Sequence, residues 1–209
     1  RVIKWMTKTL VLPEDDVALQ QSKLLVFGSL VVIGSCGVLW SALYLVLQCW
    51  WPAVFPFLYT GMAIIGALHF IYTKRIEFAR ACLTYGLILC PLGIYWVFGK
   101  EYSSVMTNWA FLGPQLAVTL GSPPRQTFAT LFGLIVLFLA LYISESILGP
   151  KALSPSDATL SPLWLNIFHV MNLCVPNVVG FFNIFFLVGQ LKEHRNELAL
   201  TLDKAELVC

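Results

Sequence analysis

The stretch "LLVFGSLVVIGSCGVLWSALYLVL", from Leu24 to Leu47, decides the fold class, because it is apolar almost throughout and contains no charged residue. A helix needs about 20 mostly apolar residues to cross the hydrocarbon core of a bilayer. Inside lipid, only a helix or a closed barrel satisfies the hydrogen bonds of the backbone. A run of this length therefore predicts a membrane-spanning α-helix.

The rest of the chain has the same character. Of its 209 residues, 58% are hydrophobic and only 11% are charged, whereas soluble proteins carry roughly 25% charged residues. So few polar groups cannot cover a globular surface, and the lipid bilayer is therefore the expected solvent for most of the chain. The net charge of +2 and the lack of a basic cluster with interleaved aromatic residues argue against a nucleic-acid partner.

Apolar runs of spanning length, or close to it, occur six times along the chain. Short connections such as "GSPPRQ" separate them, and none of the runs shows the alternation of a membrane β-barrel. The sequence therefore predicts an all-α, six-helix transmembrane bundle over residues 24–189, preceded by a cytoplasmic segment, residues 1–23. The expected spans are approximately Leu24–Leu47, Pro52–Tyr72, Arg80–Phe98, Ser103–Leu120, Thr127–Leu148 and Leu163–Gly189.

Lys and Arg residues are distributed unequally between the two predicted sides of the membrane. Eleven of the 13 fall on the side of the termini, and only Lys100 and Lys151 fall on the opposite side. Cytoplasmic loops carry an excess of Lys and Arg. Both termini are therefore predicted to be cytoplasmic, in a multi-pass protein of the plasma membrane.

Residues typical of catalysis or metal binding are scarce. The six cysteines have no metal-ligand spacing, and four lie inside apolar runs, so we interpret them as small apolar residues. The sequence contains no nucleophile with a base, no paired carboxylates and no phosphate-binding glycine loop. No catalytic residue, metal ligand or cofactor is therefore expected in this chain itself.

The last predicted span carries a polar stripe, which must face protein or water rather than lipid. The stripe occupies about 60° of a helical wheel and contains His169, Asn172, Pro176 and Asn183. One interpretation is hydrogen bonding between helices, the common use of polar residues in membrane bundles. The other is an outward-facing pocket for an unknown extracellular or lipid ligand, with Glu145, Asn166, His169 and Asn172 as its binding residues.

Charged residues return after this span, in "QLKEHRNELALTLDKAELVC", residues 190–209. No Pro interrupts this segment, so the last span is predicted to continue as a cytoplasmic transducer helix, with an output domain expected after residue 209. A weak 4-3 repeat favours parallel pairing of this helix with a second copy, and a solvated unpaired helix is the alternative. The repeat consists of Leu187, Leu191, His194, Leu198, Thr201, Ala205 and Val208.

The segment "NWAFLGPQLAVTLGSPPRQTFATLFGLIVLFLALY", from Asn108 to Tyr142, resembles the fourth and fifth membrane helices of six-helix bacterial class III adenylate cyclases. These helices often show a Trp, a Pro several residues later, and then a Gly and a Pro-Arg pair before a Phe. The stretches "GVLWSALYLVL", "PFLYTGMAIIGALHF" and "NLCVPNVVGFFNIFFLVGQ" are similar to the same family, so the resemblance covers most of residues 24–202. The matching motif residues are Trp109, Pro114, Gly121, Pro124, Arg125 and Phe128.

This resemblance implies that the bundle anchors and regulates a homodimeric adenylate cyclase. In that family the last membrane helix leads through a short transducer into a cytoplasmic domain, which converts ATP to cyclic AMP with two divalent metal ions, Mg²⁺ or Mn²⁺. ATP and metal would bind only to that following domain, because none of its catalytic residues occurs in this chain. Similar anchors precede histidine kinases, so the sensor domain of a kinase and a free-standing membrane binding or transport protein are the alternatives.

Overall fold

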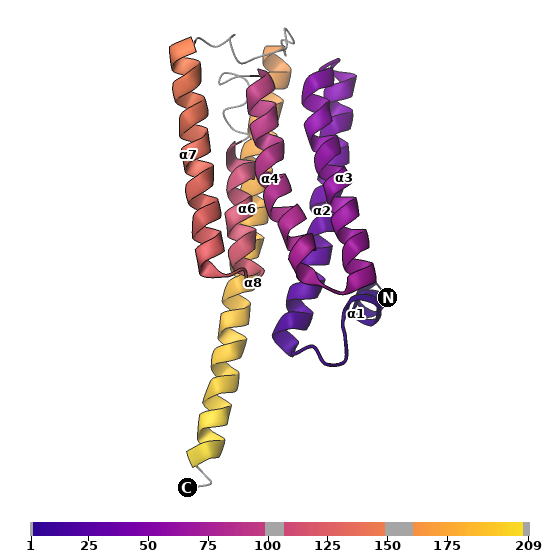
Figure 1. Ribbon diagram of the computed structural model, residues 1–209, viewed down its shortest axis with the longest axis vertical. Helices are drawn as coiled ribbons and strands as arrows, with labels where there is room; N and C mark the ends of the chain where they lie inside the picture. The colour runs from indigo at the N-terminus through magenta and orange to yellow at the C-terminus, as the bar shows by residue number, and fades with distance from the viewer. Residues whose placement is uncertain (1, 99–106, 149–160, 207–209) are drawn as a thin grey trace.

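The computed structural model describes residues 2–98, 107–148 and 161–206, and within these ranges it consists of helices joined by short turns, without a β-strand (Figure 1). Five of the helices, α2, α3, α4, α7 and α8, are long and apolar enough to span a membrane. The predicted all-α, multi-pass membrane fold is therefore confirmed. The helices are α1 (Val2–Leu10), α2 (Val17–Val46), α3 (Trp50–Thr73), α4 (Ile76–Phe98), α6 (Thr107–Thr119), α7 (Pro124–Leu148) and α8 (Pro162–Glu206).

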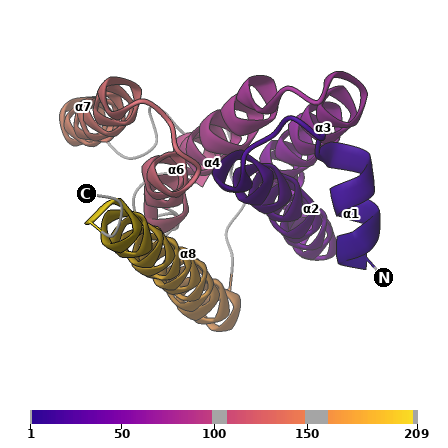
Figure 2. The same ribbon diagram turned by 90° about the horizontal axis from the view of Figure 1, so that it is seen from below.

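Successive helices from α2 onwards run in alternating directions, so both ends of the chain lie toward the same end of the molecule (Figure 1). Each of α2, α3, α4 and α6 packs against the next, and α8 packs against α6. Seen from below, α7 stands at the edge of the bundle, away from α2 and α3 (Figure 2). The position of α7 leaves most of its surface uncovered by protein.

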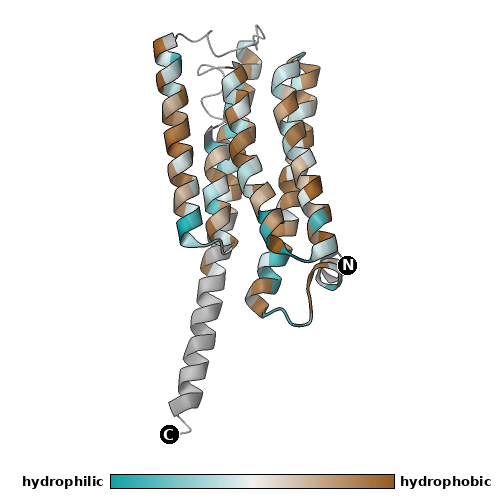
Figure 3. Cartoon of the chain, in the orientation of Figure 1, coloured by the Kyte–Doolittle hydropathy of each residue, from teal (hydrophilic) through white to brown (hydrophobic). Residues whose placement is uncertain are grey.

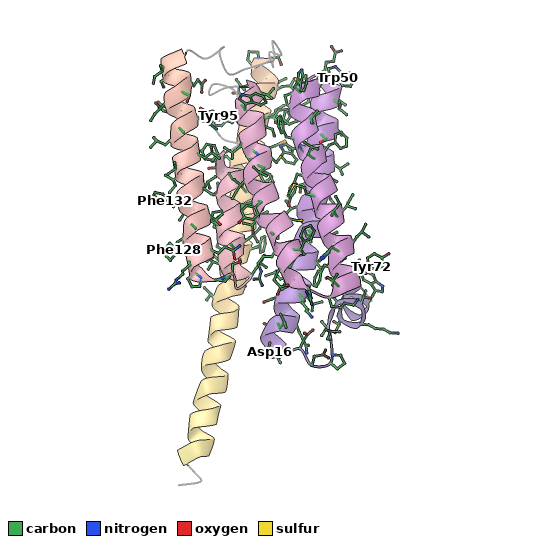
Figure 4. All side chains as sticks on the ribbon, viewed as in Figure 1. Asp16, Trp50, Tyr72, Tyr95, Phe128 and Phe132 are labelled. Atoms are coloured by element: carbon green, nitrogen blue, oxygen red, sulfur yellow. The ribbon has the colours of Figure 1, made fainter. Side chains whose placement is uncertain are left out.

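The bundle helices consist largely of apolar residues (Figure 3), and many of their side chains project outward from the bundle (Figure 4). Phe128 and Phe132 of α7 are 71% and 70% exposed, and Trp50 at the opposite end of the bundle is 68% exposed. Soluble proteins rarely expose contiguous apolar patches of this kind. The outer surface therefore contacts the lipid bilayer.

Two helices differ from the predicted spans in length. Helix α6 has 13 residues, fewer than a membrane-spanning helix needs, and residues 103–106 of the predicted fourth span lie outside the described ranges. Helix α8 has 45 residues, so the last span and the start of the transducer segment form one continuous backbone helix. The total of six spans stays a prediction.

Helix α1 has no counterpart among the predicted elements. It packs across the ends of α2 and α3 with Leu10 fully buried, and the Nζ of Lys74 donates to the carbonyl oxygen of Thr9. The following helix, α2, begins after Asp16, whose side chain accepts a hydrogen bond from the backbone N–H of Leu19 at 2.7 Å. This N-cap explains why α2 starts several residues before the apolar run does.

Small residues allow α2, α3 and α4 to approach one another closely. A Cβ atom on Gly86 of α4 would lie 2.3 Å from a ring carbon of Tyr59 on α3, and one on Gly37 of α2 would lie 2.9 Å from the carbonyl oxygen of Pro56. The Oγ1 of Thr60 also donates to the carbonyl oxygen of Gly34, at 3.1 Å. Close backbone approach at small residues is typical of helix packing in membranes.

Candidate functional site

Three side chains from three helices meet inside the bundle, and we call them the Trp–Asn cluster. The Oδ1 of Asn172 on α8 accepts hydrogen bonds from the Nε1 of Trp40 on α2, at 3.1 Å, and from the Nε1 of Trp109 on α6, at 3.0 Å. The two indole rings meet edge to face with their centroids 5.6 Å apart. All three residues are buried. Because an indole N–H only donates, two such donors fix the orientation of the Asn172 amide.

The Trp–Asn cluster links α8 to α2 and α6 through hydrogen bonds. A buried N–H left without an acceptor costs about 1–3 kcal/mol, and one oxygen of Asn172 satisfies two such groups. One turn earlier on α8, the ring of Phe168 stacks on Tyr44 of α2, with centroids 4.9 Å apart and planes 3° from parallel. These contacts define how α8 is rotated relative to α2 and α6.

The four residues of the predicted ligand pocket lie in different surroundings. Asn172 is buried in the Trp–Asn cluster, whereas Asn166 and His169 are exposed on α8. Glu145 of α7 is 6% exposed, and its Oε2 accepts a hydrogen bond of 2.7 Å from the hydroxyl of Tyr95, which lies between α4 and α7 (Figure 4). Asn172 and Glu145 thus link helices, and a ligand pocket that joins all four residues stays a prediction.

The motif residues that carry the resemblance lie mainly around the turn between α6 and α7. Gly121 has a positive φ of 70°, which favours glycine. The N–H of Gly121 donates to the carbonyl of Val118, and the N–H of Ser122 donates to the carbonyl of Ala117, the pattern of a Schellman motif that ends a helix. Among the others, Trp109 and Pro114 are buried in α6, Pro124 begins α7, and Arg125 and Phe128 are exposed.

For the 4-3 repeat predicted in the transducer helix, the structure describes only the backbone. Helix α8 continues past the lower end of the bundle as far as Glu206 (Figure 1). The side chains of Leu187, Leu191, His194, Leu198, Thr201 and Ala205, and all of Val208, lie outside the described part of the chain. The parallel pairing of this segment therefore stays a prediction.

Two residues of these helix contacts, Trp40 and Tyr95, were not among the residues assigned a role from the sequence. Each has an aromatic ring with one polar group, and such groups usually find a hydrogen-bond partner when buried. Because Trp40 and Tyr95 lie within apolar runs, the sequence indicates that each polar group needs a hydrogen-bond partner. The local sequence does not identify that partner, because Trp40 and Asn172 lie 132 residues apart.

In comparisons with known protein families, characterised proteins and solved structures, the chain has no match.

Proposed function

We propose that the chain is the membrane-anchoring and regulatory domain of a class III adenylate cyclase, placed in the plasma membrane with both termini in the cytoplasm. The observation that carries this proposal is the length and position of α8. This single 45-residue helix is hydrogen-bonded inside the bundle through Asn172 and extends beyond the bundle (Figure 1). An output domain attached to this helix would receive any rotation of α8 within the bundle. The resemblance of Asn108–Tyr142 to cyclase anchors supports a domain that makes cyclic AMP from ATP with Mg²⁺ or Mn²⁺.

The proposed working unit is a homodimer that pairs through α8. Asn166, His169 and Asn177 are exposed on α8, and lipid does not satisfy the polar groups of such side chains. The Nδ2 of Asn177 turns back to the carbonyl oxygen of Leu173, at 2.6 Å. A two-fold axis along α8 would give these side chains partners in the second copy. It would also bring the two transducer helices together.

In this proposal the Trp–Asn cluster transmits the signal to the transducer. A ligand or a change in the membrane that shifts α2 or α6 would move Trp40 or Trp109, and their shared acceptor Asn172 would turn α8. Coupling between sites is typically about 1–3 kcal/mol, or roughly 5–150-fold in activity. Regulation of this size requires no catalytic residue in the bundle.

Peptide sequencing of the natural full-length protein beyond Cys209, combined with cyclic AMP measurements in cells that lack their own cyclase, tests the proposal. We expect a nucleotide cyclase domain and cyclic AMP formation. A segment with a phosphorylatable His would refute the cyclase and identify a histidine kinase sensor instead. A chain with no further domain would refute both and leave a membrane binding or transport protein.

A further inference from the structure

A polar hollow of about 340 Å³ lies where α4 and α7 begin and α6 ends, and we call it the α4–α7 hollow. Its volume is within the range of small-ligand sites, about 300–1,000 Å³. Helix α4 contributes Arg80, Thr84 and the carboxylate of Glu77 to its wall, the turn after α6 contributes Ser122, and the first turn of α7 contributes Gln126. Each of these three elements therefore offers hydrogen-bonding groups to the α4–α7 hollow, beside apolar residues such as Ala81 and Ala117.

Thr84 has a buried hydroxyl group without a hydrogen-bond partner. The residue is 5% exposed, and its Oγ1 makes no hydrogen bond to any described residue. A threonine within a helix commonly bonds to the carbonyl oxygen four residues earlier, and five others in this structure do so. They are Thr60, Thr73, Thr119, Thr127 and Thr130. The hydroxyl of Thr84 lacks this bond, and the residue lines the α4–α7 hollow. The oxygen itself has almost no exposed surface, so an occupant of the hollow becomes its partner when the Thr84 side chain turns toward the hollow.

Arg80, one turn before Thr84, is a half-buried cation whose donors are mostly unused. Its Nη1 reaches the carbonyl oxygen of Gly121 at 3.5 Å, and its Nε has no partner among the described residues. Glu77 lies close enough to interact electrostatically. However, the salt bridge of Lys23 with Asp15 is the only one in the described part of the chain. A guanidinium has five N–H donors, so Arg80 can bind an anion in the hollow.

The start of α7 adds positive potential to the wall. Helix α7 begins at Pro124 and has 25 residues, and Gln126 in its first turn borders the hollow. Pro124 has no N–H and the N–H of Gln126 donates to the carbonyl oxygen of Pro123 at 2.9 Å, so the contribution of this end is the helix dipole. The N-terminus of a helix carries a partial positive charge and attracts anions such as phosphate. A guanidinium, hydroxyl groups and a helix N-terminus thus surround one volume, and Glu77, whose charge acts on Arg80, is the acidic residue on its wall.

These groups match a phosphate, which combines negative charge with several acceptor oxygens. The candidate membrane spans of α4 and α7 begin at Ile76 and Pro124, so the hollow lies toward the end of the bundle where lipid headgroups are expected. Basic pockets between membrane helices at this depth suit anionic headgroups. We propose that the α4–α7 hollow binds a phosphate group, carried by an anionic phospholipid or free in solution. The proposal goes beyond the regulatory function above and does not depend on which output domain follows α8.

Native mass spectrometry of the purified full-length protein, titrated with phosphatidylglycerol, tests this site. Wild type should retain this lipid, and Arg80→Gln should weaken its binding about tenfold or more, as expected for the loss of charge-assisted hydrogen bonds. Arg75→Gln removes the same charge from an exposed residue and serves as the matched control, with affinity unchanged to within about twofold. Thr84→Val should weaken binding about threefold or more, whereas Thr84→Ser should retain it, since only the first removes the hydroxyl.

Two further probes identify the source of the phosphate. Diacylglycerol has the same tails without the phosphate and should show no dependence on Arg80. Calorimetric titration with inorganic phosphate, in zwitterionic lipid, reports binding of the free ion. Binding of phosphatidylglycerol alone assigns the site to a lipid headgroup, and binding of inorganic phosphate alone assigns it to the free ion. Equal binding of both lipids, or no effect of Arg80→Gln and Thr84→Val on either phosphate probe, would overturn the proposal.

Discussion

Asn172 is a polar residue in a membrane helix, and its burial is tolerated because its Oδ1 accepts hydrogen bonds from two indole groups. The arrangement depends on the chemistry of the amide and not only on its shape. Trp40 and Trp109 carry only N–H donors, so the acceptor must come from Asn172. A side chain of similar size without an acceptor would leave two buried N–H groups unsatisfied. The stability of the bundle should therefore be sensitive to this one oxygen atom.

Asn172→Leu should lower the stability of the bundle by about 1–3 kcal/mol, the cost of leaving buried donors unpaired. Thermal unfolding of the purified protein in detergent measures the effect. Asn166→Leu is the matched control, because Asn166 lies on the same helix and is exposed. Combining Asn172→Leu with Trp40→Phe should cost less than the sum of the two single changes, since both remove the same hydrogen bond. Equal unfolding temperatures for Asn172→Leu and Asn166→Leu would contradict this role.

Asp15 and Lys23 form a salt bridge of 2.7 Å between side chains that are 5% and 4% exposed. Burial by itself raises the pKa of Asp15, but the hydrogen bonds from Lys23 and from the backbone of Leu12, together with the charge of Lys23, outweigh it and lower the pKa below its usual 3.8. The folded state therefore favours the ionised carboxylate. The resulting stabilisation is complete above the unfolded-state pKa and is lost as the pH falls through the folded-state value.

The unfolding temperature of wild type should consequently fall as the pH is lowered below about 4, the pKa range of an unperturbed aspartate. Asp15→Asn should be less stable at neutral pH and should show a shallower decline in acid, because it has no carboxylate to protonate. Unfolding curves at several pH values between neutral and acid compare the two proteins. Parallel curves for wild type and Asp15→Asn would show that this salt bridge does not control the acid response.

At the scale of helices, packing between α3 and α4 depends on how closely the backbones approach. Gly86 faces the ring of Tyr59 at a distance that leaves no room for a methyl group. Gly61, on α3, has no atom within 4 Å of a Cβ built at its position. Replacing each glycine by alanine gives the same gain in helix preference at both positions. Only the replacement at Gly86 also tests the tight packing.

Gly86→Ala should destabilise the bundle by about 1–3 kcal/mol, the usual cost of overpacking. Gly61→Ala should be neutral or stabilising by up to about 1 kcal/mol, because alanine favours a helix where space is available. Thermal unfolding of both variants under identical conditions gives the comparison. A loss of stability in Gly61→Ala equal to that in Gly86→Ala would mean that close approach at Tyr59 is not the cause.

Sequence reasoning predicted the long helices well and their partners poorly, for one physical reason. In lipid, a long apolar run satisfies its backbone hydrogen bonds by forming a helix. The helices α2, α3, α4, α7 and α8 therefore follow from composition. Helix α1 is mixed in polarity and depends on contacts such as that of Trp5 with Phe27, whose rings lie 6.1 Å apart. The polar stripe on α8 predicted contacts between helices, but which donor meets Asn172 depends on residues far apart in the chain.

At the scale of the whole molecule, α7 and α8 differ in what their exposed surfaces carry. The exposed residues of α7 include Ile135 and Leu139, which lipid solvates, whereas those of α8 include Asn166 and Asn177. Leu173 is 45% exposed and lies seven residues after Asn166 and four before Asn177, spacings that place all three on one face of the helix. If the proposed homodimer pairs through this face, Leu173 lies close to its counterpart in the second copy.

Leu173→Cys should therefore form a disulfide-linked dimer when membranes are treated with a mild oxidant, because cysteines near a two-fold axis reach the Cα separation of about 4.4–6.8 Å that a disulfide needs. Cys174 is exposed, so it is replaced by Ser together with Cys209 to remove background cross-linking. Ile135→Cys in the same background is the control, with an equally apolar and exposed position on α7. Non-reducing electrophoresis should show a dimer for Leu173→Cys and little for Ile135→Cys. Strong cross-linking of Ile135→Cys alone would move the interface to α7, and the polar face of α8 would then need a partner other than a second copy of this chain.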